Sequence, residues 1–220
     1  MRLNKYLAHA TGMGRRSADK AIEEGRVMVN GVVAEVGQQV GNDDKILLDS
    51  SLLQADSTAH TIILNKPVGY VCSREGQGSK TIYDLLPPDL HHLKPVGRLD
   101  KDSSGLLLLT SDGDLSNRLT HPKYQKTKVY EITLDKDLSE ADFETITKDG
   151  VRLEDGTSRL GLDFMNDGNT KWQVTMHEGR NRQIRRTFAA LGYVVTELHR
   201  TRIGDYMLND LRISEYKETA

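Results

Sequence analysis

Cysteine and long apolar runs are nearly absent from this chain of 220 residues. Its one cysteine, Cys72, excludes a disulfide within the chain and a zinc site built from several thiolates. No strictly apolar run is longer than the four leucines at 106–109, too short to span a membrane. The first twenty residues also lack the apolar block of a signal peptide, so the sequence predicts a cytoplasmic protein with no membrane partner.

Charge is nearly balanced over the whole chain, with a formal net charge of -2, but it is unevenly distributed. Residues 1–30 carry six basic and three acidic side chains, and residues 176–203 carry six and two. Residues 135–170 hold ten acids against four bases. Two basic segments and an acidic one suit a protein that binds a polyanion on one side, although ordinary solvated surfaces would give the same pattern.

The first 50 residues predict a small domain of two helices followed by short strands. Apolar residues at helical spacing indicate a helix over 2–10, and a second helix would begin with Ser17 as its N-cap and end before Gly25. The pair Asn30-Gly31 between two β-rich runs predicts a tight hairpin, and "DKILLD" at 44–49 a further strand. The polar residues 51–60 predict a linker.

This segment, "RLNKYLAHATGMGRRSADKAIEEGRVMVNGVVAEVG", resembles the S4-like RNA-binding domain over about residues 1–50. In that family the basic residues of the helices face RNA. The resemblance therefore implies contacts to the RNA backbone, which position RNA without reading its sequence. The residues concerned are Arg2, Lys5, Arg15, Arg16 and Lys20.

Residues 61–220 predict a second, larger α+β domain. Strand-like and helix-like segments alternate at uneven spacings without a glycine-rich phosphate loop, which favours a mixed, mainly antiparallel sheet with flanking helices. The run "GLLLLT" at 105–110 is too continuously apolar for a half-exposed strand. We expect it to be a central strand, buried on both faces.

Asp100 stands immediately before this run, in "GRLDKDSSGLLLLTSDG" at 97–113. Taken alone, it would be expected to cap the polar turn that follows it. The segment is similar, however, to one found in pseudouridine synthases, and four further segments match the same superfamily in order. They are "LNKPVGYVCS" at 64–73, "KVYEI" at 128–132, "EGRNRQIRRTFAALGYVV" at 178–195 and "LHRTRIG" at 198–204. With the S4-like segment, the pattern resembles the RsuA-type family of ribosomal RNA pseudouridine synthases.

The resemblance implies that the protein isomerises a uridine in ribosomal RNA, free or in a subunit assembly particle. The reaction moves the glycosidic bond from N1 to C5 of the base without net oxidation, so no cofactor is expected. The seven histidines are scattered apart from one adjacent pair, and no spacing predicts a metal site. We expect a monomer.

Asp100 is the expected catalytic group, either as a nucleophile at the base or sugar or as a base that removes a sugar proton; the residues do not choose among these. Since burial disfavours a charged carboxylate, a cation is needed beside it. The resemblance assigns that cation to Arg185. A helix from about residue 180 would place Arg182 and Arg186 on the same face, free for RNA phosphates, with apolar residues opposite.

Three further residues receive roles from the resemblance. Tyr130, in an alternating strand, would stack on the flipped target base. Arg98 would fill the place that the flipped base vacates or clamp a phosphate. Lys66 would help to shape a tight turn beside the pocket, with Asn65, Pro67 and Gly69, and would also contact RNA.

Two other functions stay open at this point. One is a non-catalytic RNA-binding factor for ribosome assembly, in which the S4-like domain acts alone. The other is a hydrolase acting on a nucleoside or glycan, which would need a second carboxylate, with Asp102 and Asp112 as candidates.

Overall fold

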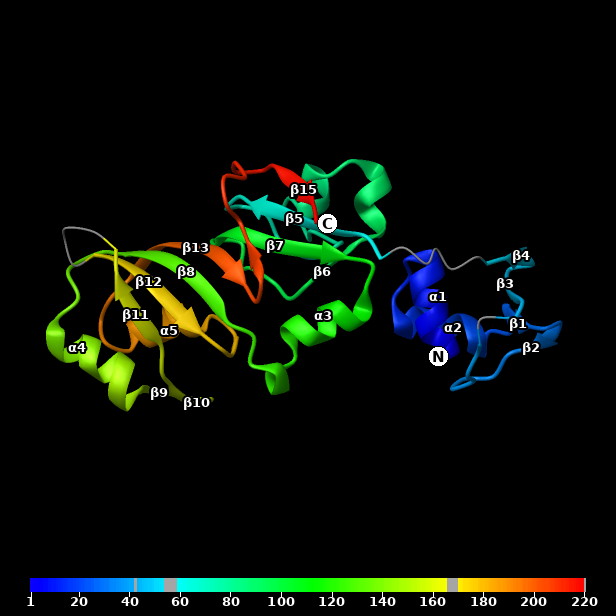
Figure 1. Ribbon diagram of the computed structural model, residues 1–220, viewed down its shortest axis with the longest axis horizontal. Coiled ribbons are helices and arrows are strands. Elements are labelled where there is room, and N and C mark those ends of the chain that lie inside the picture. Colours follow the sequence, from blue (N-terminus) through cyan, green and yellow to red (C-terminus); the bar gives the residue numbers. More distant parts are fainter. Residues whose placement is uncertain (42, 54–58, 166–169, 220) are drawn as a thin grey trace.

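Two helices pack against a small antiparallel sheet at the N-terminal end of the protein, drawn in blue in Figure 1. The computed structural model describes residues 1–41, 43–53, 59–165 and 170–219. The helices are α1 (Leu3–Thr11) and α2 (Arg15–Glu23). The strands, in the sheet order β2-β1-β3-β4, are β1 (Val27–Val29), β2 (Val32–Val33), β3 (Ile46–Leu48) and β4 (Ser51–Leu52).

This part of the chain follows the sequence closely, with two differences. The hairpin turns at Asn30 and Gly31, both with positive φ, as that residue pair predicts. The second helix begins earlier than predicted, with Gly14 in place of Ser17 as its N-cap. Strand β4 extends the small sheet two residues into the segment expected to be a linker, whose residues 54–58 lie outside the described residues.

The larger part contains a nine-stranded mixed sheet (Figure 1). Its main order is β11-β12-β8-β13-β7-β5-β15, with β6 beside β7 and β14 beside β13. Every pairing in it is antiparallel except β13 with β7, so the predicted mixed, mainly antiparallel sheet is confirmed. The strands are β5 (Thr61–Lys66), β6 (Lys94–Pro95), β7 (Ser104–Thr110), β8 (Lys128–Leu134), β11 (Gly161–Phe164), β12 (Lys171–Met176), β13 (Val195–Ile203), β14 (Tyr206–Met207) and β15 (Tyr216–Glu218).

Short helices and one hairpin connect these strands. The hairpin pairs β9 (Val151–Leu153) with β10 (Gly156–Ser158) as a separate two-stranded sheet. The helical segments are the 3₁₀ turns η1 (Ile82–Leu85), η2 (Pro88–His92) and η3 (Pro122–Tyr124), the α-helices α3 (Gly113–Thr120), α4 (Glu140–Glu144) and α5 (Gln183–Ala189), and the π-turn η4 (Thr145–Asp149).

The leucine-rich strand β7 lies inside the sheet, between β13 and β5, and its side chains are buried on both faces. Leu107 and Leu109 belong to the largest apolar cluster, whereas Leu106 and Leu108 belong to a second cluster with residues such as Ile203. The prediction of a central, doubly buried strand is therefore confirmed, and the polar turn that carries Asp100 is attached directly to this strand.

Gly105 allows β7 to approach β13 closely at the start of the strand. Its φ is +102°, and a Cβ atom there would lie 2.2 Å from the carbonyl oxygen of Arg200. A side chain cannot fit at this position without moving the backbone of one strand. The close approach brings the turn that contains Asp100 beside the polar residues of β13 and the loop before α5.

Candidate active site

A cavity of about 440 Å³ opens where the turn before β7, strands β8 and β13, and the loop before α5 meet. Asp100 and Tyr130, two of the three predicted catalytic residues, line it. Arg98 and Arg182, expected to contact RNA, also line it, and apolar side chains such as Leu198 complete its wall. A cavity of this size with a few converging polar groups is typical of a ligand site.

Lys66 stabilises the turn that contains Asp100 through hydrogen bonds to its main chain. Its side chain is fully buried, and its ammonium donates to the carbonyl oxygens of Pro67 at 3.0 Å, Asp100 at 3.1 Å and Ser103 at 2.7 Å. Burial lowers the pKa of Lys66 below its usual value. The predicted contact between Lys66 and RNA is therefore wrong, because the ammonium is enclosed by the protein and satisfied by three main-chain oxygens.

The carboxylate of Asp100 is free of the turn that follows it. The turn's hydrogen bond runs from Ser103 N to the main-chain oxygen of Asp100, at 3.1 Å. The carboxylate instead faces Arg182, with Oδ2 at 3.4 Å from Nη1. This geometry disfavours a turn-capping role and leaves the carboxylate accessible from the cavity.

In this structure Arg182, and not the expected Arg185, is in direct contact with Asp100, while Arg185 lies close enough for the Asp100 carboxylate to act on its charge. Helix α5 begins at Gln183 instead of about residue 180, and Arg182 precedes it in the left-handed region, with φ of 45°. Arg182 therefore does not take the position on the helix surface that a helix beginning near residue 180 would give it. Burial lowers the pKa of Arg185, whose guanidinium donates to the main-chain oxygens of Val195 at 2.5 Å and Asp102 at 2.7 Å.

Asp102 connects the two arginines. Arg182 donates to both of its carboxylate oxygens at 2.9 Å, and Arg185 Nε lies 3.4 Å from Oδ2. The hydrogen bonds from Arg182 lower the pKa of Asp102 and raise that of Arg182. Asp102 thus orients the arginines, and Asp112 caps α3 by accepting from the backbone of Asp114. Neither carboxylate is placed as the second acid of a hydrolase.

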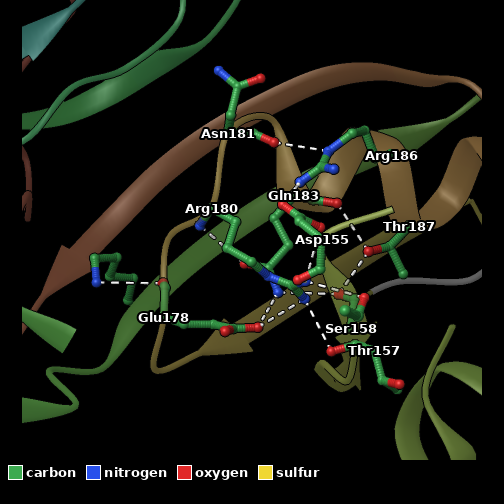
Figure 2. A network of polar contacts seen from close by, with 11 residues as sticks. Asp155, Thr157, Ser158, Glu178, Arg180, Asn181, Gln183, Arg186 and Thr187 are labelled. Carbon is green, nitrogen blue, oxygen red and sulfur yellow. Dashed lines mark hydrogen bonds and ion pairs between the residues drawn. The ribbon is translucent and has the colours of Figure 1, made fainter. Parts of the chain in front are cut away.

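The loop before α5 is fixed by the network of Figure 2. Asp155, at the tip of the β9–β10 hairpin, lies 2.9 Å from Arg180 and 2.7 Å from Arg186. Gln183 and Thr187 both contact Ser158 Oγ, at 3.1 and 2.8 Å. Arg186 is thus already paired with a carboxylate, contrary to the free position expected for an RNA contact.

The apolar side of α5 agrees with the sequence. Ile184 and Phe188 are buried in the largest cluster, and Leu191 packs against it. The predicted division of the helix into a packed side and a basic side is confirmed for Arg185 and Arg186, which contact acids, whereas Arg182 precedes the helix.

Tyr130 and Arg200 form the floor of the cavity. Tyr130 is 8% exposed, and the Arg200 guanidinium carbon lies 5.9 Å from the centre of its ring. Arg200 is 2% exposed and donates through Nε to the oxygen of Leu106 at 2.8 Å. Arg200 was not predicted from the sequence as a site residue. The signal that could have identified it is a charged residue in the middle of a strand-like segment, at a position expected to be buried. Lys128 also lines the cavity, and burial lowers its pKa.

The predicted RNA-binding residues of the N-terminal part differ in their contacts. Arg2, Arg15, Arg16 and Lys20 are exposed, with Arg15 donating to Asn4 and Lys20 Nζ 3.7 Å from Glu24. Lys5 instead pairs with Asp114 of α3, with Nζ 2.7 Å from Oδ2. In this arrangement the Lys5 ammonium forms an ion pair with a carboxylate of the larger part, and an RNA contact would have to replace that pair.

A second contact joins the same two parts. Lys94 of β6 donates to the oxygen of Met13 at 2.7 Å. In Figure 1 the blue helices accordingly lie beside the end of the sheet that carries β6.

The part of the chain that the structure describes contains no group of three or more histidine, cysteine or acidic side chains placed to hold a metal ion. Across the same residues, no helix has the length and apolarity needed to cross a membrane.

Comparison with known proteins agrees with this geometry. A family model described as RNA pseudouridylate synthase matches residues 60–190, and an S4 domain model matches residues 1–46. A crystal structure of a pseudouridylate synthase superposes with a TM-score of 0.70 at 35% identity, covering all of this chain and 96% of that one.

Curated relatives extend the match over nearly the whole chain. The ribosomal large subunit pseudouridine synthase B of Pseudomonas aeruginosa is 38% identical over 99% of this chain, which spans 59% of that protein's length. The ribosomal small subunit pseudouridine synthase A of Haemophilus influenzae is also 38% identical, over 99% of this chain and 95% of its own. The chain belongs to the RNA pseudouridylate synthase family and carries an S4 domain before the synthase domain.

Proposed function

We propose that the protein isomerises a specific uridine of ribosomal RNA to pseudouridine, with Asp100 acting on a flipped-out nucleotide and without a cofactor. The observation that carries the proposal is the carboxylate of Asp100, which faces the Arg182 guanidinium at 3.4 Å in a cavity floored by Tyr130. Membership of the family supports the reaction class.

The reaction balances without an added reactant. The N1–C1′ bond breaks, the base turns, and a C5–C1′ bond forms. The hydrogen at C5 leaves as a proton, and N1 takes up a proton in its place. Because nothing is oxidised or reduced, the protein has to supply binding, orientation and charge, which the cavity's polar groups can provide.

We assign roles to four of the side chains that line the cavity. Asp100 reacts with the base or the sugar, or removes a sugar proton, and the Arg182 guanidinium lies beside its carboxylate at 3.4 Å. Tyr130 offers a ring on which a base can stack. Flipping a base costs a few kcal/mol of lost stacking, and the exposed Arg98 at the cavity would compensate by filling the vacated place.

The names of the relatives support ribosomal RNA as the substrate and include both ribosomal subunits. The exposed basic residues of the S4 domain, Arg2, Arg15, Arg16 and Lys20, would hold the RNA backbone. We place the reaction in the cytoplasm, by a monomer acting on free RNA or on a subunit assembly particle.

The experiment uses ribosomal RNA labelled with tritium at uridine C5. The protein is mixed separately with unmodified small-subunit and large-subunit RNA, free and in particles, and tritium released to water is counted. Stoichiometric release from one RNA is expected, because C5 loses its hydrogen when it becomes the glycosidic carbon. Tight binding without release from any of these RNAs would overturn the proposal in favour of a non-catalytic assembly factor.

A further inference from the structure

A short basic segment leads to Tyr130 and contributes several residues to the cavity lining. Residues 118–130, which lead from α3 through η3 into β8, contain four basic side chains and no acidic one. They are Arg118, Lys123, Lys126 and Lys128. His121, Pro122, Lys126 and Lys128 line the same cavity as Asp100, so the segment is continuous with the candidate active site.

Tyr124 presents its ring to solvent in the middle of this segment. It is 40% exposed and is absent from the apolar clusters of the described residues. His121 lies edge-on to it, with ring centres 6.2 Å apart, and Lys123 Nζ lies 4.6 Å from the centre of its ring. Tyr124 does not itself line the cavity, but it lies between Pro122 and Lys126, which do. Because the ring is outside every apolar cluster, its position beside the cavity calls for an explanation other than core packing.

The turn that carries this ring is closely held by hydrogen bonds. Tyr124 N donates to the oxygen of His121 at 3.1 Å, and Lys123 N donates to His121 Nδ1 at 3.2 Å. Gln125 N donates to the oxygen of Pro122 at 3.1 Å, with Gln125 in the left-handed region. The ring therefore stands on a preorganised backbone, which reduces the entropy lost when a ligand binds to it.

We propose that Tyr124 is the stacking platform for the base of a nucleotide adjacent to the target uridine, with Lys123 and Lys126 beside the phosphates of the same strand. This rests on the proposed function, because flipping one nucleotide into the cavity leaves its neighbours unstacked at the mouth. Unpaired bases bind proteins by stacking on aromatic rings, and lysines complement the backbone between them. Arg118 is paired with Asp112 and Lys128 is half-buried, so Lys123 and Lys126 are the cations available to a ligand. An acidic protein surface would satisfy these charges alone, whereas RNA also offers bases that stack on the exposed ring.

The test compares Tyr124→Ala and Tyr124→Trp with the wild type. The control is Tyr216→Ala, which removes a tyrosine of similar exposure, 39%, from strand β15, outside the cavity lining. Affinity for the ribosomal RNA is measured by filter binding, and KM and kcat by tritium release. We expect Tyr124→Ala to weaken binding and raise KM about 5- to 150-fold, the usual effect of losing one stacked base. The Trp variant and the control should stay within about twofold of the wild type, with kcat retained in all of them.

A second arm identifies the base. In a fragment of the RNA that contains the modified uridine, each neighbouring nucleotide is made abasic in turn. Removing the stacked base should weaken wild-type binding as much as Tyr124→Ala does, and combining the two changes should add nothing further. Fully additive losses, or binding by Tyr124→Ala equal to that of the control, would overturn the inference and assign the ring to another partner.

Failure of the inference and failure of the proposed function give different results. Turnover by the wild type with no effect of Tyr124→Ala refutes the platform alone. Binding of ribosomal RNA that depends on Tyr124 without tritium release refutes the catalytic proposal while the platform stands.

Discussion

Replacing Lys66 by methionine separates the structural role of this lysine from the RNA contact that the sequence suggested. Methionine has a similar length and fills the same buried space without a donor. Three main-chain oxygens lose their charged hydrogen-bond donor. The most deeply buried of the three hydrogen bonds is the one to Ser103. One buried acceptor left unsatisfied costs about 1–3 kcal/mol, and removing the desolvated charge offsets part of this. We therefore expect the free energy of unfolding to fall by about 1–3 kcal/mol.

Thermal and denaturant unfolding measure this loss, with Tm expected to fall by about 2–4 °C for each kcal/mol. The pH dependence gives a second check. Burial lowers the pKa of Lys66 in the folded state, so between that pKa and the usual 10.5 the unfolded chain binds more protons. The wild type should therefore gain stability relative to Lys66→Met as the pH rises through this window.

Lys101→Met is the matched control, since Lys101 is exposed on the same turn and donates to Ser79. It should change stability by less than about 0.5 kcal/mol. For Lys66→Met, the slope of log affinity against log salt should equal that of the wild type, because no phosphate contact is lost. A slope reduced by about one, with stability unchanged, would refute the buried role and restore the RNA contact.

Three other predictions follow from the contacts around the cavity. Arg182→Gln should lower kcat by about tenfold or more while the fold is kept, because Asp100 loses the guanidinium that faces its carboxylate; kinetics under RNA saturation check this, and an unchanged kcat would contradict it. Asp114→Asn should raise RNA affinity about 1.5- to 5-fold by releasing Lys5 from an exposed ion pair, measured by salt-dependent binding, with unchanged affinity as the contrary result. Gly105→Ala should destabilise the fold by about 3 kcal/mol or more, since its Cβ would meet the backbone of β13; a wild-type Tm would refute this.

Much of the fold was predictable because local patterns and tertiary structure agree. The alternation and continuity of apolar residues identified β7 as central, and Asn30-Gly31 identified the first hairpin. The misplaced start of the second helix shows the limit of such signals. Ser17 is a good capping residue, but the chain enters the helix three residues earlier, at Gly14.

The site was predictable in its main residues and not in its ion pairs. Asp100 and Tyr130 line one cavity, as the motifs suggested. The cation facing Asp100 could not be derived, because the start of α5 depends on the left-handed conformation of Arg182 and on contacts from distant segments. The acid partner of Arg186, Asp155, comes from a hairpin 31 residues away, and no local pattern predicts that contact.

Single-turnover release of tritium from C5-labelled ribosomal RNA by Asp100→Asn tests the central claim most directly. The wild type and Asp210→Asn, which removes an exposed carboxylate outside the cavity lining, serve as references. The account predicts no release by Asp100→Asn, with wild-type RNA affinity and a Tm within a few degrees of the wild type, since the change removes a reacting group and no core contact. Release at the wild-type rate would contradict the catalytic role of Asp100. An unfolded variant would indicate that Asp100 stabilises its turn instead.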